Sequence, residues 1–131
     1  QQIKDRALDL MQKMKIKDLK DRLPSEVSGG QQQRCSMARA IINNPDLVMA
    51  DEPTGNLNSS SSEAVLDILS ELNNKGQSIV MVTHEVKSAC RANRIIFLRD
   101  GHIEDDLRFD KDLKFEEKEV QLLKWLAGKD W

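Results

Sequence analysis

The sequence contains no tyrosine, and its only aromatic residues are three phenylalanines and two tryptophans. Charged residues make up 32% of the 131 residues, so the core of a single domain of this length is modest. No apolar run approaches the length of about 20 residues that crosses a bilayer. The longest apolar clusters span only residues 79–82 and 95–98. We therefore expect no direct membrane insertion, and any membrane role must depend on a partner.

The sequence also has few cysteines and no concentration of positive charge. Cys35 and Cys90 are isolated, with no Cys-x-x-Cys pair and no signal-peptide pattern, which is typical of a reducing cytosol. We expect both to be core thiols. The net charge is −2, and Lys and Arg are spread along the whole chain. The lack of a basic stripe argues against a nucleic-acid partner.

The first part of the chain predicts helices alternating with strands. Apolar spacing predicts a helix over 3–14 and a second from Ser28 to about residue 42, whose buried face carries Cys35, Ala38 and Ile42. The continuous apolar run 47–50 predicts a strand covered on both faces, as in a parallel sheet. A helix over 60–75, capped by Ser60 with Glu63 and stopped by Gly76, and a strand over 78–83 complete a right-handed crossover. The fold class is therefore α/β.

The remaining chain predicts a short helix over 86–92 and a hairpin. The hairpin strands cover 94–98 and 102–104 and are joined by a two-residue turn, Asp100-Gly101. A final helix ends before Gly128, with one apolar face formed by Phe115, Leu122, Leu123 and Leu126.

Two adjacent acids follow the strand 47–50. Mg²⁺ bound to phosphates prefers oxygen ligands and keeps several waters, which suits Asp51. The neighbouring carboxylate can orient and polarise a water for in-line attack on a γ-phosphate, which suits Glu52. An isolated Asp-Glu pair can equally well begin a loop. The motifs on either side favour the chemical interpretation.

Ser28, Gly29 and Gly30 open the second predicted helix. Ser28 and Gln31 form a capping-box pair, which explains the serine. Two glycines in a first turn cost helix stability and are useful where a ligand approaches the backbone. His84 stands directly after a predicted strand, where a lone histidine is usually a surface residue. His102, in the hairpin, is interpreted as a surface residue.

The chain contains three motifs in this order: Ser28-Gly29-Gly30-Gln31, Asp51-Glu52-Pro53-Thr54 and Thr83-His84-Glu85. Together they resemble the motifs of the nucleotide-binding subunit of an ABC transporter. The resemblance runs from about residue 7 to about residue 105. The sequence of residues 51–57 is most similar to that of the group that serves lipoprotein release, macrolide export, cell division and antimicrobial-peptide export.

The resemblance implies part of a P-loop, RecA-like ATPase core that acts on ATP with Mg²⁺. It assigns the metal to Asp51, catalysis to Glu52 and His84, and nucleotide binding to Ser28, Gly29, Gly30, Gln31 and Asn58. His84 would be the switch histidine that contacts the γ-phosphate. The segment from Ser28 would reach the nucleotide of a second subunit. The family usually has aspartate where this chain has Asn58, and we hypothesise that the lost charge weakens communication between the two sites of a dimer.

The phosphate-binding loop Gly-x-x-x-x-Gly-Lys-[Ser/Thr] is absent, because the only Gly-Lys pair, Gly128-Lys129, has Leu123 and Asp130 at the other defining positions. We expect the chain to be the half of the nucleotide-binding domain that runs from the signature motif at Ser28 to the switch histidine, His84. Its parts are residues 1–28 in the helical signature subdomain, 29–107 in the C-terminal half of the core and 108–131 as a helical extension. Unpaired strand edges should make the isolated chain associate with another copy, exchange elements or depend on an upstream half. Alone it should not hydrolyse ATP.

The resemblance further implies a homodimer of nucleotide-binding subunits docked on transmembrane subunits, cytoplasmic and peripheral on the inner face of the membrane. One alternative is the ATPase head of a chromosome-structure or DNA-repair protein, although residues 3–14 are too short for the coiled coil of that class. A second alternative, a ribosome-associated ABC protein, is disfavoured because the chain has no basic surface and because of the sequence of residues 31–34. A non-catalytic interaction fragment is the last alternative.

Overall fold

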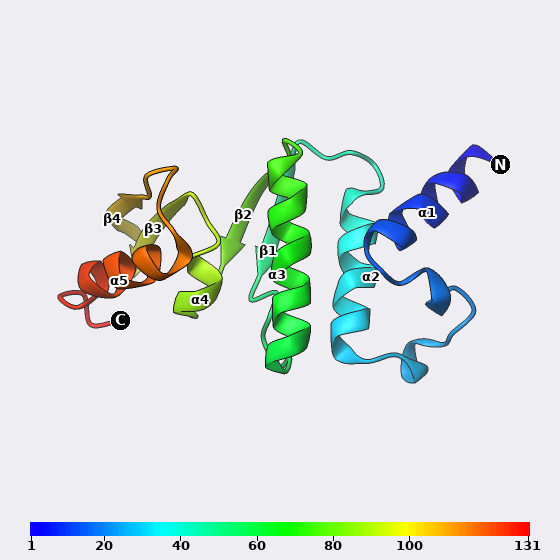
Figure 1. Ribbon diagram of the computed structural model, residues 1–131, viewed down its shortest axis with the longest axis horizontal. Coiled ribbons are helices and arrows are strands. Elements are labelled where there is room, and N and C mark those ends of the chain that lie inside the picture. Colours follow the sequence, from blue (N-terminus) through cyan, green and yellow to red (C-terminus); the bar gives the residue numbers. More distant parts are fainter. The chain divides into compact units, whose positions relative to one another are not determined.

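The computed structural model describes all residues from 1 to 131, and the chain divides into two compact units. The first unit, residues 1–82, contains helices α1 (Gln2–Lys13), α2 (Gly29–Ile41) and α3 (Ser59–Asn74) and strands β1 (Leu47–Asp51) and β2 (Ser78–Val82). The second unit, residues 83–131, contains α4 (Val86–Ala89), β3 (Arg94–Arg99), β4 (His102–Arg108) and α5 (Phe115–Leu126) (Figure 1). Two short 3₁₀ turns, Lys17–Leu19 and Pro24–Glu26, lie between α1 and α2.

The first unit confirms the predicted strand–helix–strand arrangement. β1 and β2 pair in parallel, from Leu47 opposite Ser78 to Asp51 opposite Val82, and α3 connects them. α2 and α3 lie side by side (Figure 1). α3 ends as predicted, because Gly76 has a φ of +99° and the N–H of Gln77 donates to the carbonyl of Leu72 at 3.1 Å. The α/β class predicted from the sequence is confirmed.

The expectation that β1 is covered on both faces is wrong. Val48 is buried against the helices, but its neighbours Leu47 and Met49 are 49% and 75% exposed. Val80 and Val82 of β2 share that open face and are 46% and 51% exposed. Successive strand residues point to opposite faces, and the helices of this unit supply apolar partners to one face only. An apolar run allows burial of both faces but cannot supply the second covering layer.

The N-cap of α3 also differs from the sequence prediction. The helix begins at Ser59, and its N-cap is Asn58, whose Oδ1 accepts the N–H of Ser61 at 2.8 Å. The predicted pair of Ser60 and Glu63 does not form a capping box. The serine run offers several interchangeable caps, and asparagine is among the best N-cap residues. Asn58 therefore has a structural task that the sequence motif did not indicate.

The buried face of α2 lies one residue away from the predicted one. Its buried residues are Gly30, Met37 and Ile41, whereas Cys35, Ala38 and Ile42 are half-buried at the margin of the core. Cys35 is thus a marginal core thiol. The main core of this unit is entirely aliphatic and consists of Leu10, Met14, Ile16, Met37, Ile41, Val48, Val65, Leu66, Ile68 and Leu69.

The second unit contains an antiparallel hairpin packed with α4 and α5. Asp100 and Gly101 both have positive φ, as a two-residue hairpin turn requires. The return strand is longer than predicted, because β4 continues to Arg108 beyond a bulge beside Phe97 and Leu98. α4 is shorter than predicted, since it ends at Ala89 and not at residue 92.

The apolar face of α5 is narrower than predicted. Leu122 and Leu126 are buried, but Phe115 and Leu123 are 37% and 49% exposed, so only part of the predicted apolar face is covered. Cys90 is buried in this core, which confirms its assignment as a core thiol. Burial and, to a lesser degree, the carboxylate of Glu119 raise the pKa of the Cys90 thiol, so the thiol stays protonated and unreactive.

Candidate functional site

The N-terminus of α2 carries the first predicted motif. The N–H of Ser28 donates to Oε1 of Gln31 at 2.8 Å, and Oγ of Ser28 accepts the N–H of Gln31 at 3.2 Å. This is the predicted capping box, and it is confirmed. Ser28 and Gly29 are exposed and the first turn contains no acidic residue, so the positive end of the helix dipole faces solvent at this point.

The two glycines of this turn have different surroundings. A Cβ atom on Gly29 would lie 3.3 Å from Cδ2 of Leu57. A Cβ atom on Gly30 would lie only 2.9 Å from Cβ and 3.0 Å from Oγ of Ser61, closer than real Cβ atoms approach. The start of α2 therefore packs against the first turn of α3. This packing reason for glycine has no sequence signature, because Gly30 and Ser61 are far apart in the chain and share no local pattern.

The acid pair lies at the carboxyl end of β1. Asp51 is the last residue of the strand and is exposed. The N–H of Glu52 donates to the carbonyl of Val82 at 2.8 Å, which ties it to the end of β2. Glu52 has a φ of +45°, a conformation that is uncommon for a residue with a side chain and that often marks functional sites. Its side chain is half-buried, with Oε2 inaccessible to solvent. Asp51 and Glu52 therefore occupy different environments.

The loop after the acid pair is compact. The N–H of Gly55 donates to the carbonyl of Glu52 at 3.0 Å, and the N–H of Leu57 donates to that of Thr54 at 3.2 Å. Thr54 is 1% exposed. The loop delivers Leu57 to the start of α2 and Asn58 to the start of α3. Residues 28–30 and 57–61, which are separated in the sequence, are thus brought together.

His84 belongs to the second unit and is exposed. The backbone that follows it is fixed locally, since the N–H of Glu85 donates to Oγ1 of Thr83 at 3.1 Å. Glu85 is the N-cap residue of α4, and its Oε2 accepts the hydroxyl of Ser88 at 2.8 Å. Ser88 is completely buried, a role that the sequence analysis did not assign. The approach of His84 to the acid pair stays a prediction. His102 is exposed at the start of β4, as expected.

A groove of the first unit does not contain these residues. Its volume is about 430 Å³, and its lining includes Leu10, Ile41, Asp46 and Gln77. Asp46 and Gln77 immediately precede β1 and β2, so the groove lies at the amino ends of the parallel strands. In open α/β sheets the functional residues gather at the opposite, carboxyl ends. We therefore place the candidate site at the acid pair and not in the groove.

Comparisons with known proteins support the family that the sequence predicts. A family model for the ABC transporter matches residues 2–55. The macrolide export ATP-binding/permease protein MacB of Mannheimia succiniciproducens is 50% identical over 101 residues, which cover 77% of this chain and 16% of that protein. This chain belongs to the ABC transporter ATP-binding family.

Further ABC relatives extend the match. The uncharacterized ABC transporter ATP-binding protein MJ1508 of Methanocaldococcus jannaschii is 51% identical over 98 residues, or 75% of this chain and 44% of the relative. The dimeric post-hydrolysis structure of the ATP-binding cassette MJ0796, bound to ADP and Pi, superposes with a TM-score of 0.66 at 38% identity. This superposition covers 79% of this chain and 46% of that cassette. The chain thus spans less than half the length of these relatives.

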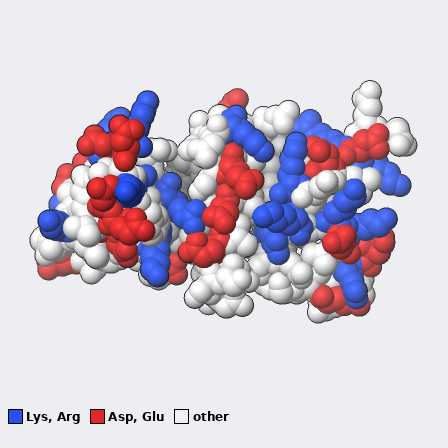
Figure 2. All heavy atoms as spheres, viewed as in Figure 1, with Lys and Arg blue, Asp and Glu red and all other residues white.

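The surface of this ABC chain carries both signs of charge. Figure 2 shows acidic side chains along α3, where Glu63, Asp67 and Glu71 are exposed, beside basic side chains over α2. No helix of the chain combines the length and the apolarity needed to cross a bilayer. No group of three or more His, Cys, Asp and Glu side chains is arranged to hold a metal ion.

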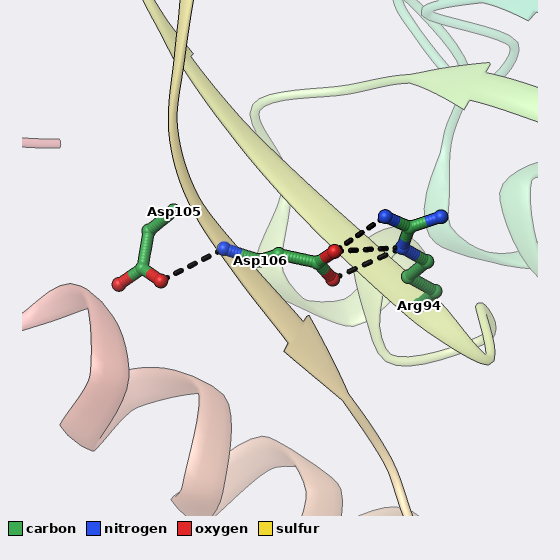
Figure 3. Close-up of polar contacts among 3 residues, drawn as sticks. All are labelled: Arg94, Asp105 and Asp106. Carbon is green, nitrogen blue, oxygen red and sulfur yellow. Dashed lines mark hydrogen bonds and ion pairs between the residues drawn. The ribbon is translucent and has the colours of Figure 1, made fainter.

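A second cluster of charges lies on the hairpin and links its strands β3 and β4. The guanidinium of Arg94 on β3 forms an ion pair with the carboxylate of Asp106 on β4, and the Nε–H of Arg94 lies 3.0 Å from both carboxylate oxygens (Figure 3). The N–H of Asp106 donates to Oδ1 of Asp105 at 2.8 Å. The hydrogen bond from Arg94 lowers the pKa of Asp106, and the one from Lys129 lowers the pKa of Asp105.

Proposed function

We propose that this chain is the signature-to-switch part of an ATP-hydrolysing subunit that drives a membrane transporter. The observation that supports it most strongly is the packing of residues 28–30 against residues 57–61. This packing sets an anion-binding helix start beside the loop that follows an acid pair. Residues 1–28 would belong to the helical signature subdomain, 29–107 to the C-terminal half of the ATPase core and 108–131 to a C-terminal extension.

The donor at Asp51 fits the Mg²⁺ that accompanies ATP. Mg²⁺ at phosphate sites is held by one or two carboxylates together with phosphate oxygens and waters. Asp51 offers one exposed carboxylate at the end of a parallel strand, where such a ligand is expected. Bound Mg²⁺ would neutralise charge on the phosphates. In this role Asp51 holds and orients the ion and takes no part in proton transfer.

Glu52 and His84 would act on the γ-phosphate. The half-buried carboxylate of Glu52 would accept a hydrogen bond from the attacking water and orient it in line. It would receive the proton as the water oxygen bonds to the γ-phosphorus and the bond from that phosphorus to the departing ADP breaks. His84 donates a hydrogen bond to a γ-phosphate oxygen and so fixes the geometry of the attack. The backbone of Glu52 is left-handed, and its side chain is half-buried whereas that of Asp51 is exposed.

The start of α2 would bind the nucleotide held by a second subunit. Oγ of Ser28 already accepts the N–H of Gln31, but its own hydroxyl proton can still be donated to a phosphate oxygen. Oε1 of Gln31 already accepts a hydrogen bond in the capping box, so Gln31 would contact the nucleotide through its backbone and its side-chain NH₂ group. Gly29 leaves the backbone accessible, and Asn58 lies on the adjoining loop. The active assembly would therefore be a homodimer.

The proposed partners and location are those that membership of the family suggests. We propose that the full-length subunit is cytoplasmic and docks on transmembrane subunits at the inner face of the cell membrane. Several relatives are named macrolide export proteins, which supports a place in the export group. The chain has no loop that wraps the β- and γ-phosphates, so by itself it should not hydrolyse ATP.

The test compares this chain with the full-length protein. ATP titration should detect binding only in the full-length protein. There, Glu52→Gln should retain ATP binding and lose at least about 100-fold in kcat, because a general base contributes about 10²–10⁴. Glu71→Gln, an exposed acid on α3, is the matched control and should hydrolyse ATP at the wild-type rate. Hydrolysis by this chain alone, or full activity of Glu52→Gln, would refute the proposal.

A further inference from the structure

Ser61 joins two parts of the candidate site. Its backbone N–H donates to Oδ1 of Asn58 at 2.8 Å, so it belongs to the cap that starts α3. Its half-buried side chain faces Gly30, where an added Cβ would lie 2.9 Å from Cβ and 3.0 Å from Oγ. One residue thus contacts both the loop that carries Asn58 and the helix start that carries the signature glycines.

The contact at Gly30 is rigid, whereas the contact at Gly29 can yield. The Cβ of Ser61 is fixed by the backbone of α3, so it cannot move unless the helix moves. The neighbour of Gly29 is Cδ2 of Leu57, the far end of a flexible side chain, and it lies 3.3 Å from an added Cβ. The separation between α2 and α3 at their first turns is therefore set by Gly30 and Ser61.

We propose that Ser61 is a positioning residue for nucleotide hydrolysis, which fixes the start of α2 against the loop 57–58. This inference rests on the proposed function. A shift of Asn58 moves the first turn of α3 through the cap, and the close contact of Ser61 with Gly30 passes that shift to the amides of residues 28–30. The signature turn and the loop would then move as one body when the second subunit binds.

The test is a double-mutant cycle in the full-length protein. Gly30→Ala should lower kcat/KM for ATP about tenfold or more, because overpacking at a rigid contact forces α2 and α3 apart. Adding Ser61→Gly should restore kcat/KM to within about threefold of the wild type, since it removes both close atoms. Adding Ser61→Ala should not restore it, because the Cβ at 2.9 Å remains. Ser60→Gly, an exposed residue of the same helical turn, controls for the helix-breaking effect of glycine and should not rescue.

A second measurement separates this inference from the proposed function. Amide hydrogen exchange of a peptide covering residues 28–34 in the full-length protein reports how well the first turns of α2 are protected, without any hydrolysis. Exchange should be faster in Gly30→Ala, return to the wild-type rate with Ser61→Gly and stay fast with Ser61→Ala. If the wild type hydrolyses no ATP, the proposed function fails while this pattern can still hold. If Ser61→Gly rescues neither exchange nor hydrolysis, or Ser61→Ala rescues as well, the positioning role is overturned.

Discussion

The interactions inside the first unit differ from those inside the second unit. The core of the first unit, residues 1–82, contains only Leu, Ile, Val and Met side chains. The core of the second unit is smaller and is surrounded by aromatic and charged contacts. Phe97 and Trp125 meet edge to face with centroids 6.1 Å apart, and the Nζ of Lys129 lies 4.8 Å from the Trp125 ring centroid while pairing with Asp105 at 2.6 Å.

This difference predicts how the stability of each unit responds to pH. Burial of aliphatic groups is non-directional and depends little on pH, so it gives the helix starts and the acid pair a stable frame. The second unit also has a buried core, and its exposed ion pairs add small contributions that depend on the protonation of their carboxylates. Both tryptophans lie in the second unit, so tryptophan fluorescence follows that unit, while the long helices of the first unit dominate the circular dichroism signal.

The largest expected effect is the loss of a core side chain in the first unit. Leu66 is 3% exposed, and Leu66→Ala should lower the free energy of unfolding by about 2–5 kcal/mol because it leaves a cavity. Urea titration followed by circular dichroism measures this. Ile3→Ala, at a residue 83% exposed, should change the free energy by less than about 0.5 kcal/mol. An equal shift of the fluorescence transition would show that the units unfold together, which would break the comparison.

The second unit offers two adjacent leucines for the same test. Leu122 is 1% exposed, and Leu122→Ala should cost about 2–5 kcal/mol in the tryptophan fluorescence transition. Leu123 is 49% exposed on the same helix, and Leu123→Ala should cost less than about 0.5 kcal/mol. Equal effects of the two variants would mean that α5 does not pack on the face described above.

A smaller effect is expected at the cap of α3. Asn58→Ala should destabilise the first unit by about 1 kcal/mol, because the N–H of Ser61 loses its acceptor. Asn58→Asp should keep the stability, since both residues cap well. Thermal unfolding followed by circular dichroism measures both variants. In the full-length protein, near-equal turnover of Asn58→Asp would show that the departure from the family's usual aspartate is neutral. A destabilised Asn58→Asp would contradict the capping role.

The smallest effect concerns the exposed pair of Arg94 and Asp106. Its ion pair lowers the pKa of Asp106 in the folded chain below the ordinary 3.8. The pair therefore stabilises the folded state at pH values above 3.8, and this contribution is lost as the pH falls through the folded pKa. Asp106→Asn should destabilise the second unit near neutral pH and match the wild type at low pH.

Tryptophan fluorescence during urea titration from about pH 6 down to about pH 2 measures this dependence. Asp110→Asn, at an exposed residue after β4, is the control and should retain the pH dependence of the wild type. A pH dependence that Asp106→Asn leaves unchanged would show that the ion pair does not contribute.

Local features were well predicted from the sequence. The capping box of Ser28 and Gln31 depends on residues three apart, and the stop at Gly76 depends on a single backbone conformation that glycine adopts freely. The cap of α3 was predicted at the wrong residue, because Asn58 and the serines that follow it are all good caps. The path of the loop after the acid pair decides among them.

Contacts between distant segments could not be predicted. The apolar run of β1 does not reveal that Met49 is exposed, since that depends on which faces the helices cover. The narrow stripe of α5 likewise depends on what packs against it. The pair of Gly30 and Ser61 has no sequence signature, because a glycine needed for close packing looks the same as one needed for a ligand.

The sequence by itself determined the α/β class, the family and the order of the motifs, because periodicity, caps and short motifs are properties of neighbouring residues. Only the tertiary structure decided that Asn58 caps α3, that one face of the parallel strands is open and that Ser61 packs against Gly30. These features depend on which surfaces meet when distant segments pack, and the pattern along a single segment does not encode that meeting.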